Sequence, residues 1–259
     1  MFPFIFPKIT INSHKQVYIG QPLVILTTVD STNKYAMEEV HAHMAKHGTA
    51  YFALEQREGR GQRGKTWKTT PGENIILTVV TEPQCLFPAN PFLFNAAIAL
   101  ACYRFYKTWA GDETRVKWPN DLYWRDRKAG GVLIENVVHG NTWTFALVGI
   151  GININQVQFD PNIPNPVSLR QIRGEVLDPL VLAKELMILI EEYWQVWKNN
   201  PAELMAEYNE ILFRKGEKAK FKAGNRIFEA FVSGVNESGE LMVHTATEEC
   251  FKVGQLIWL

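Results

Sequence analysis

The sequence predicts an α+β fold in two parts, and three observations support that prediction. Strand-like runs rich in β-branched residues and long helical patterns are mixed over residues 1–212. The helical period disappears at Phe213, after which short alternating runs are separated by Gly-Asn and Ser-Gly turns. That rhythm over residues 213–259 is typical of a small closed barrel of about five strands. We therefore expect two domains, 1–212 and 213–259.

The predicted strands follow one another in a clear order. Residues 1–21 contain short extended pieces with little helical pattern. The strands of the first part are expected at 23–29, 49–54, 75–80, 114–117, 130–136 and 142–149. Those of the second part are expected at 218–222, 226–235, 241–245 and 251–253. A Pro- and Asn-rich loop is expected over residues 156–166.

Each predicted helix begins with a start signal. Asp30, Ser31 and Thr32 carry short oxygen side chains that can accept the unpaired N–H groups of a first helical turn, and Gly48 is expected to end that helix. The remaining helices are expected at 91–111, 178–198 and 200–212, each with a proline near its start.

Composition and charge narrow the class of protein. The 27 basic residues balance 27 acidic ones, so the formal net charge is zero and a nucleic-acid partner is not expected. Three cysteines are too few for a disulfide framework, which favours a reducing, cytoplasmic setting. No run reaches the roughly 18 uninterrupted apolar residues of a membrane-spanning helix. The apolar start, 1–7, lacks the basic region of a signal peptide, so no membrane partner is expected.

A glycine-rich basic segment, Gly59–Trp67, is the first candidate for chemistry. Its glycines are interleaved with Arg60, Arg63 and Lys65. Glycine allows consecutive N–H groups to turn inward and form an anion-binding nest, to which the cations would add charge. The segment therefore suits a phosphate or an acyl phosphate, although a surface hairpin with a few charges is the alternative.

Two lysines stand at strand ends. Lys117 lies where a predicted strand meets a Pro-Asn-Asp turn, so it would project into a cleft as a compact charge for a phosphate or carboxylate. The alternative is a type I turn with an exposed lysine. Lys128 precedes the paired glycines Gly130 and Gly131, which indicate either close backbone approach to a ligand or a β-bulge.

A second glycine pattern lies at the end of the predicted strand 142–149. Gly149 and Gly151 alternate with apolar residues, so both lie on one strand face and would leave room for a flat ligand against the backbone. Asn153 continues that face and could offer its amide to a purine edge. The alternative is a glycine-rich strand that packs against a helix.

The histidines do not predict a metal site. His41, His43 and His47 cluster on the first predicted helix, and the last two share the i, i+4 spacing of a zinc pair. No third ligand is evident, so we expect a polar, solvated helix face and no metal ligands. The sequence also shows no paired-carboxylate or Ser/His/Asp arrangement.

Taken in order, these segments resemble biotin protein ligase (biotin–[acetyl-CoA-carboxylase] ligase). Each motif alone is weak, but five in one order are specific. The resemblance is close over 23–155 and loose over 213–259. The matching motifs are Asp30-Ser-Thr-Asn33, Gln56 with Gly59-Arg-Gly-x-x-Gly64 and Trp67, Lys117-Trp-Pro-Asn-Asp121, Arg127-Lys-x-Gly-Gly131, and Gly149-x-Gly-x-Asn153.

The resemblance implies a fold and a two-step reaction. The fold would be a mixed sheet with helices mainly on one face, as in class II aminoacyl-tRNA synthetases and biotin ligases, followed by an SH3-like barrel. Biotin would react with ATP, supplied with Mg²⁺, to give biotinoyl-5′-adenylate and pyrophosphate. The biotinoyl group would then pass to a specific lysine of a biotin carboxyl carrier protein, such as the acetyl-CoA carboxylase subunit.

The resemblance also implies roles for individual residues. Lys117 and Arg60 would be catalytic. Biotin would be bound by Ser31, Thr32, Asn33, Gln56, Arg60, Gly61, Gln62, Lys117, Gly149 and Gly151. ATP and the adenylate would be bound by Arg60, Arg63, Lys65, Trp67, Lys128 and Asn153.

The chain departs from the family pattern in two ways. Gln62 stands where the loop often carries a second arginine, and Lys65 stands where arginine is common, which removes a bidentate option. Some relatives carry a winged helix-turn-helix and repress transcription, but only about 22 residues precede the first predicted strand here. We therefore expect no DNA-binding function; the resemblance leaves a homodimer open.

Two other functions would fit parts of the pattern. A lipoate–protein ligase resembles this fold but would normally carry an Arg-Arg-x-Ser-Gly-Gly-Gly type of loop. Adenylate formation with biotin but not with lipoate or octanoate would separate the two. A biotin sensor without catalysis is the second alternative, against which Lys117 and the intact loop argue; it would show no biotin-dependent ATP–pyrophosphate exchange.

Overall fold

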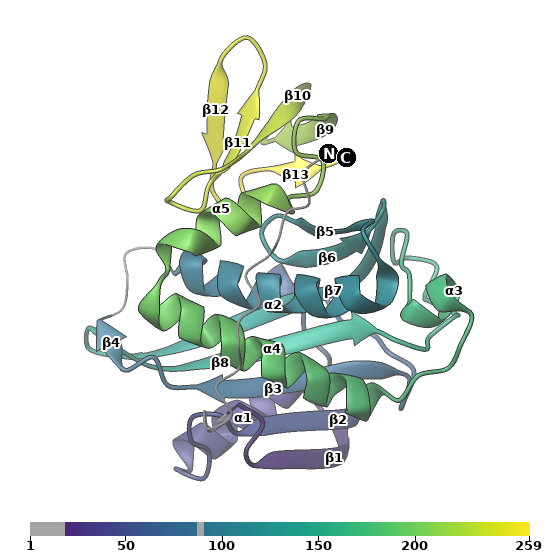
Figure 1. The fold of residues 1–259 in the computed structure, drawn as a ribbon, viewed down its shortest axis with the longest axis vertical. Helices are drawn as coiled ribbons and strands as arrows, with labels where there is room; N and C mark the ends of the chain where they lie inside the picture. The colour runs from purple at the N-terminus through teal and green to yellow at the C-terminus, as the bar shows by residue number, and fades with distance from the viewer. Residues whose placement is uncertain (1–18, 87–90) are drawn as a thin grey trace, which may run out of the picture.

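An eight-stranded mixed sheet forms the centre of the structure, a computed structural model that describes residues 19–86 and 91–259 (Figure 1). Its main path is β1-β2-β3-β8-β7-β6-β5, and β4 pairs with β8 beside that path. β1 and β2 are parallel and the other pairs are antiparallel. The strands are β1 (Leu23–Val29), β2 (Ala50–Gln56), β3 (Asn74–Thr81), β4 (Cys85–Leu86), β5 (Thr114–Lys117), β6 (Asp121–Trp124), β7 (Arg127–His139) and β8 (Thr142–Asn153).

Helices cover both faces of this sheet unequally. α2 and α4 pack together on one face, whereas α1 lies on the other (Figure 1). β3 is buried along its whole length because it lies between these layers. The helices are α1 (Thr32–His41), α2 (Phe92–Ala110), α3 (Leu169–Arg173), α4 (Pro179–Asn199) and α5 (Ala202–Glu210), with a 3-10 turn, η1 (Gln62–Gly64). The expected α+β arrangement, with helices mainly on one face, is confirmed.

A second, antiparallel sheet of five strands follows, in the order β12-β11-β10-β9-β13. This confirms the all-β C-terminal part. Its strands are β9 (Lys218–Ala223), β10 (Arg226–Val235), β11 (Leu241–His244), β12 (Glu248–Phe251) and β13 (Ile257–Trp258).

The two sheets share one buried core. Trp118 Nε1 donates a hydrogen bond to the Gly239 carbonyl at 3.0 Å, and Asn209 in α5 exchanges hydrogen bonds with the backbone of Val235. Phe221 and Val243 of the second sheet belong to the same hydrophobic cluster as α2 and β3. The division into domains at 212 and 213 stays a prediction.

Several local expectations differ from the structure. The expected pieces at 1–21 lie almost entirely outside the described residues. The first helix ends at His41 rather than Gly48, because the chain turns at Ala42 and His43 has a φ of +59°. The strand expected at 251–253 is Glu248–Phe251, and β6 and α3 were not anticipated.

The histidine cluster is also not the solvated helix face that was expected. His43 and His47 follow the end of α1, so they do not share a helical surface. His47 is half-buried, stacks on Trp194 with ring centroids 4.9 Å apart, and accepts a hydrogen bond at Nδ1 from the Glu82 N–H. Burial lowers the pKa of His47.

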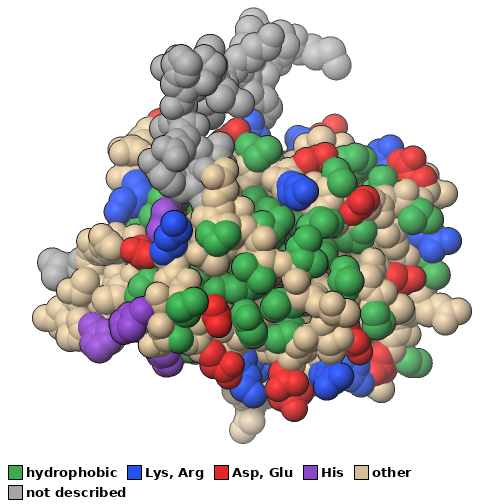
Figure 2. All heavy atoms as spheres, turned by 90° about the horizontal axis from the view of Figure 1, so that it is seen from below, with side chains coloured by type: hydrophobic (Ala, Val, Ile, Leu, Met, Phe, Trp, Pro, Cys, Tyr) green, Lys and Arg blue, Asp and Glu red, His purple; other side chains and the backbone are tan. Residues whose placement is uncertain are grey.

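The surface at the β1 end of the molecule carries hydrophobic side chains. Figure 2 shows them gathered near the middle of this face, with acidic and basic side chains around them. β1 is the last strand on its side of the sheet, and Ile25 within it is 52 % exposed. Among the described residues, no helix is long and apolar enough to cross a membrane.

Candidate active site

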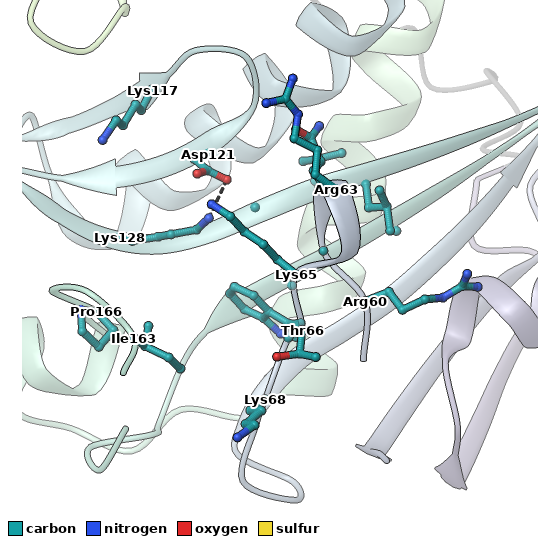
Figure 3. A pocket seen from close by; sticks show the side chains of 18 of the residues that line it. Arg60, Arg63, Lys65, Thr66, Lys68, Lys117, Asp121, Lys128, Ile163 and Pro166 are labelled. Atoms are coloured by element: carbon teal, nitrogen blue, oxygen red, sulfur yellow. Dashed lines mark ion pairs between the residues drawn. The ribbon is translucent and has the colours of Figure 1, made fainter. Parts of the chain in front are cut away.

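A cavity of about 790 Å³ lies where the large sheet meets the second sheet. Its walls come from the start of α1, the hairpin after β2, strands β5 to β8, the loop 159–166 and the segment 253–258 (Figure 3). Every residue that the resemblance assigned to the reaction lines this one cavity. These residues are Ser31, Thr32, Asn33, Gln56, Arg60, Gly61, Gln62, Arg63, Lys65, Trp67, Lys117, Lys128, Gly149, Gly151 and Asn153. Their individual roles remain predictions.

The start of α1 is stabilised differently from the sequence expectation. Ser31 is the N-cap residue, but its hydroxyl makes no capping hydrogen bond. Instead Gln56 Oε1, from the end of β2, accepts hydrogen bonds from Thr32 N at 2.8 Å and Thr32 Oγ1 at 3.0 Å. A side chain from strand β2, rather than the buried Ser31 hydroxyl, therefore caps the start of α1.

Asn33 belongs to a dense polar network beneath the cavity. Its Nδ2 donates to Glu135 Oε2 at 2.7 Å, and its Oδ1 accepts from Thr78 Oγ1 at 2.6 Å. Thr78 Oγ1 also lies 2.8 Å from Thr32 Oγ1. Because buried polar groups need partners, this network fixes the Asn33 side chain in one orientation.

The two glycines of β8 make room for protein side chains, which corrects the expected bare surface. A Cβ on Gly149 would lie 2.3 Å from Asn33 Oδ1, and one on Gly151 would lie 2.5 Å from Cε2 of the Trp67 indole. Asn33 and Trp67 therefore cover the strand face at these points. A flat ligand would lie against these side chains rather than against the β8 backbone.

The glycine-rich segment forms a hairpin that is closed by backbone hydrogen bonds. Gly61 N donates to the Lys65 carbonyl and Trp67 N donates to the Gly59 carbonyl, each at 2.7 Å. These N–H groups are therefore engaged within the hairpin. The hairpin backbone matches the alternative raised by the sequence, but its charged side chains border the cavity, so phosphate binding by this segment stays a prediction.

Asn153 is less free than the sequence suggested. Its side chain is buried, and Nδ2 donates to the Val167 carbonyl at 3.1 Å. One of its two amide N–H donors is thus engaged by the protein, which leaves the second N–H for a purine edge. Oδ1 could accept a hydrogen bond from the same ligand.

The cavity is ringed by cations with uneven pairing (Figure 3). Lys128 Nζ lies 2.7 Å from Asp121 Oδ1, and the Lys65 side chain extends toward the same carboxylate. Arg60 Nη1 lies 3.7 Å from Glu135 Oε1. That pair is half-exposed and long, so it contributes little and can be exchanged for a ligand anion.

Lys117 is a half-buried cation of this group. Its Nζ donates to Tyr123 Oη at 3.4 Å. Burial lowers the pKa of Lys117 to about 8; Asp121 opposes that shift, and Lys128 and Arg214 reinforce it. A lysine with few engaged N–H donors at a cavity wall is suited to bind an incoming anion.

Several residues of the site were not singled out from the sequence. Asp121 ends one of the motifs and Glu135 lies in the predicted strand 130–136, so their carboxylates could have been considered as partners of the cations. Thr78, Tyr123 and Trp258 lie in ordinary strand patterns and offered no signal. Within the described residues, no group of three or more His, Cys, Asp or Glu side chains could hold a metal ion.

Comparison with known proteins gives the class. Residues 25–153 match the model of the biotin/lipoate A/B protein ligase family. The chain belongs to this family.

The most similar relatives narrow the class further. The chain is 28% identical to the biotin–[acetyl-CoA-carboxylase] ligase of Paracoccus denitrificans, over 85% of this chain and 92% of that one. It is 27% identical to the bifunctional ligase/repressor BirA of Bacillus spizizenii, over 89% and 72%. The fold is similar to biotin protein ligase from Aquifex aeolicus in complex with biotin and ATP, with a TM-score of 0.78, 24% identity and coverage of 92% and 98%. The first and third of these relatives are named as biotin ligases, and the second as a ligase and repressor.

Proposed function

We propose that this protein is an ATP-dependent biotin protein ligase. One observation carries the proposal: the basic hairpin, Lys117 and the Thr32–Gln56 pair, which are far apart in the sequence, line one cavity. Family membership and the biotin ligases among its relatives support the same function.

The first step joins two anions, which explains the ring of cations. The biotin carboxylate attacks the α-phosphorus of ATP, a new oxygen–phosphorus bond forms, and pyrophosphate leaves. Lys117 and Arg60 would offset the repulsion between the anions and the charge that develops in the transition state. Lys65, Arg63 and Lys128 would hold the phosphates. Mg²⁺ would arrive with ATP as part of the substrate, and we assign it no protein ligand.

Biotin itself is largely uncharged and needs placed hydrogen bonds on an apolar wall. Ser31 and Thr32 supply hydroxyls at the α1 end of the cavity, and Gln56 fixes the backbone beside them. Gly149 would contribute indirectly. Because it has no side chain, Asn33 can pack against it, and Asn33 would contact biotin. Gly61 and Gln62, at the hairpin, would close the opposite side.

The nucleotide would lie beside Trp67, which covers Gly151. The Trp67 Nε1 atom is buried without a hydrogen-bond partner within the described residues, so a bound ligand could provide one. Asn153 Oδ1 lies on the same side of the cavity.

In the second step, the acceptor lysine of a biotin carboxyl carrier protein would attack the acyl carbon and release AMP. A cytoplasmic location would supply all three substrates.

Biotin-dependent exchange of labelled pyrophosphate into ATP tests the first step. We expect exchange with biotin and Mg²⁺ but none with lipoate or octanoate. Exchange with lipoate instead would favour the lipoate ligase alternative. A folded protein that binds biotin without exchange would be the non-catalytic sensor.

The second step needs its own assay. A biotin carboxyl carrier domain should gain one biotinoyl group, detected by intact mass, and the same domain with its acceptor lysine replaced by arginine should gain none. Equal labelling of both domains would mean that the adenylate leaves the enzyme and reacts with other lysines, without enzymatic transfer.

A further inference from the structure

The ammonium group of Lys117 lies among three aromatic rings. Nζ is 4.8 Å from the ring centroid of Tyr123, 5.1 Å from that of Trp258 and 5.6 Å from that of Phe213. All three distances are within the roughly 6 Å range of a cation–π contact. We call Tyr123, Phe213 and Trp258 the aromatic cage.

The aromatic cage is assembled from three separate parts of the chain. Tyr123 lies in β6, Phe213 in the connection after α5, and Trp258 in β13 of the second sheet. Phe213 N donates to the Val116 carbonyl at 2.8 Å, which fixes this connection beside the strand that carries Lys117. The rings also contact each other, since the centroids of Tyr123 and Phe213 are 5.0 Å apart and those of Phe213 and Trp258 are 5.8 Å apart.

Trp258 is held from behind by its own sheet. Its ring centroid lies 4.8 Å from that of Phe221, its partner across the β9–β13 pair. Its Nε1 is buried and makes no hydrogen bond within the described residues. The Trp258 ring is therefore held by its contacts with Lys117, Phe213 and Phe221, not by its N–H group.

The charges around Lys117 make such a cage useful. Lys128, Arg214 and Lys65 face it as cations, and the Asp121 carboxylate faces it as an anion. Asp121, however, is paired with Lys128 at 2.7 Å. Within the described residues Lys117 forms no ion pair of its own, and only Tyr123 Oη accepts one of its donors.

Aromatic faces stabilise an ammonium without engaging its N–H donors as a carboxylate would. A caged lysine keeps its charge in a fixed place and retains donors for a ligand. This is electrostatic preorganisation: the ammonium is already oriented in the folded protein before the substrate binds.

We propose that Trp258 is a positioning residue for adenylate formation, which completes an aromatic cage around the Lys117 ammonium and so makes the second sheet part of the active site. This inference rests on the proposed function, because Lys117 matters to the reaction only if the protein forms an acyl adenylate.

The test compares two replacements of Trp258. Trp258→Phe keeps an aromatic face, whereas Trp258→Leu keeps an apolar side chain without one. We expect Trp258→Leu to lower the rate of biotinoyl-adenylate formation about tenfold, with most of the loss in kcat, and Trp258→Phe to restore most of it. Phe251→Leu, which removes a ring from the same sheet away from Lys117, is the matched control and should retain the wild-type rate.

The pH profile separates positioning from simple loss of structure. Losing an aromatic face destabilises the charged lysine, so the limb on which activity falls with rising pH should move to lower pH in Trp258→Leu and stay in place in Trp258→Phe and Phe251→Leu. Equal rates and an unchanged limb in Trp258→Leu would overturn the proposal. Equal loss in Trp258→Leu and Trp258→Phe would overturn it as well.

A second measurement does not depend on catalysis. The ¹³Cε signal of Lys117, in protein labelled at lysine and assigned with Lys117→Arg, reports its titration without substrates. We expect the midpoint to fall by about half a pH unit or more in Trp258→Leu and to hold in Trp258→Phe. An unchanged midpoint in Trp258→Leu refutes the cage even if the wild type is inactive. Absence of biotin-dependent exchange in the wild type would instead refute the proposed function.

Discussion

At the scale of single residues, the proposed reaction depends most on the positive charge of Lys117. Burial lowers its pKa to about 8, so its protonated fraction decreases as pH rises through that value. We expect Lys117→Ala to abolish adenylate formation, and wild-type kcat/KM to fall above about pH 8 because the free enzyme loses this positive charge. Pyrophosphate exchange measured from pH 6 to 10 checks both expectations.

The matched control for Lys117 is Lys220→Ala, an exposed lysine of the second sheet. It should retain both rate and pH profile, with unfolding temperature confirming that each variant is folded. Wild-type activity in folded Lys117→Ala would remove this lysine from the reaction. A profile that keeps rising to pH 10 would show that its protonated form is not required.

Arg60 is the second residue for which the structure makes a definite expectation. Its exposed, 3.7 Å pair with Glu135 is weak and can give way to a phosphate. Arg60→Ala should therefore speed release of the preformed adenylate by about tenfold or more, the effect of losing a charged hydrogen bond. Stopped-flow release measures this rate, and Arg57→Ala, an exposed neighbour away from the cavity, should leave it unchanged. An unaltered rate in Arg60→Ala would contradict its assigned role.

At the scale of elements, the glycines of β8 leave space that side chains from other elements occupy. Gly151 admits the Trp67 indole, and a Cβ there would approach Trp67 to within 2.5 Å. Gly151→Ala should displace the indole and weaken nucleotide binding about tenfold, since overpacking costs roughly 1–3 kcal/mol. Biotin affinity should change less, because Asn33 rather than Trp67 borders its expected site.

Calorimetry with biotin, and then with a non-hydrolysable ATP analogue, measures the two affinities separately. Thr142→Ala, at the exposed start of the same strand, is the control and should alter neither. If Gly151→Ala binds both ligands as the wild type does, the indole does not form part of the nucleotide site.

Much of this fold could be predicted from sequence because its signals are local. The helix α4 begins at Asp178, which caps it through hydrogen bonds to Leu180 N and Val181 N, as its Asp-Pro start indicated. The prediction for the start of α1 was wrong about the capping residue, because the cap is Gln56, which lies on strand β2. A cap that comes from a distant element leaves no local signal.

The same reasoning explains which parts of the site were predictable. Lys117 and the basic hairpin stand out because glycines and cations are concentrated in a short stretch. The aromatic cage could not be predicted, since Tyr123 and Trp258 are separated by more than half the chain and each has an ordinary strand pattern. Whether a glycine face admits a ligand or a side chain also depends on tertiary packing, as Gly149 shows.

At the scale of the whole molecule, the two sheets should behave as one cooperative unit. Their buried residues form one cluster, and Trp118 and Asn209 hydrogen-bond across the junction. We therefore expect a single unfolding transition, with tryptophan fluorescence and far-ultraviolet circular dichroism giving the same midpoint in denaturant. Two separated transitions would show that the second sheet folds independently and would weaken its link to the active site.

The segment 253–258 connects this cooperative unit to the cavity, because its residues form part of the cavity wall. It brings Gly254 against the Arg63 side chain and Trp258 against Lys117, so the second sheet borders the cavity from both the hairpin and the strand side. The wall of this cavity is therefore complete only when both sheets are in place.

The most direct test of the central claim is a crystal structure of the protein after incubation with biotin, ATP and Mg²⁺. We expect density for biotinoyl-5′-adenylate in the cavity between the hairpin and β8, with its biotin rings near Thr32 and Asn33 and its phosphate within hydrogen-bonding distance of Lys117 or Arg60. Density for either molecule elsewhere on the protein, with this cavity filled only by solvent, would contradict the account.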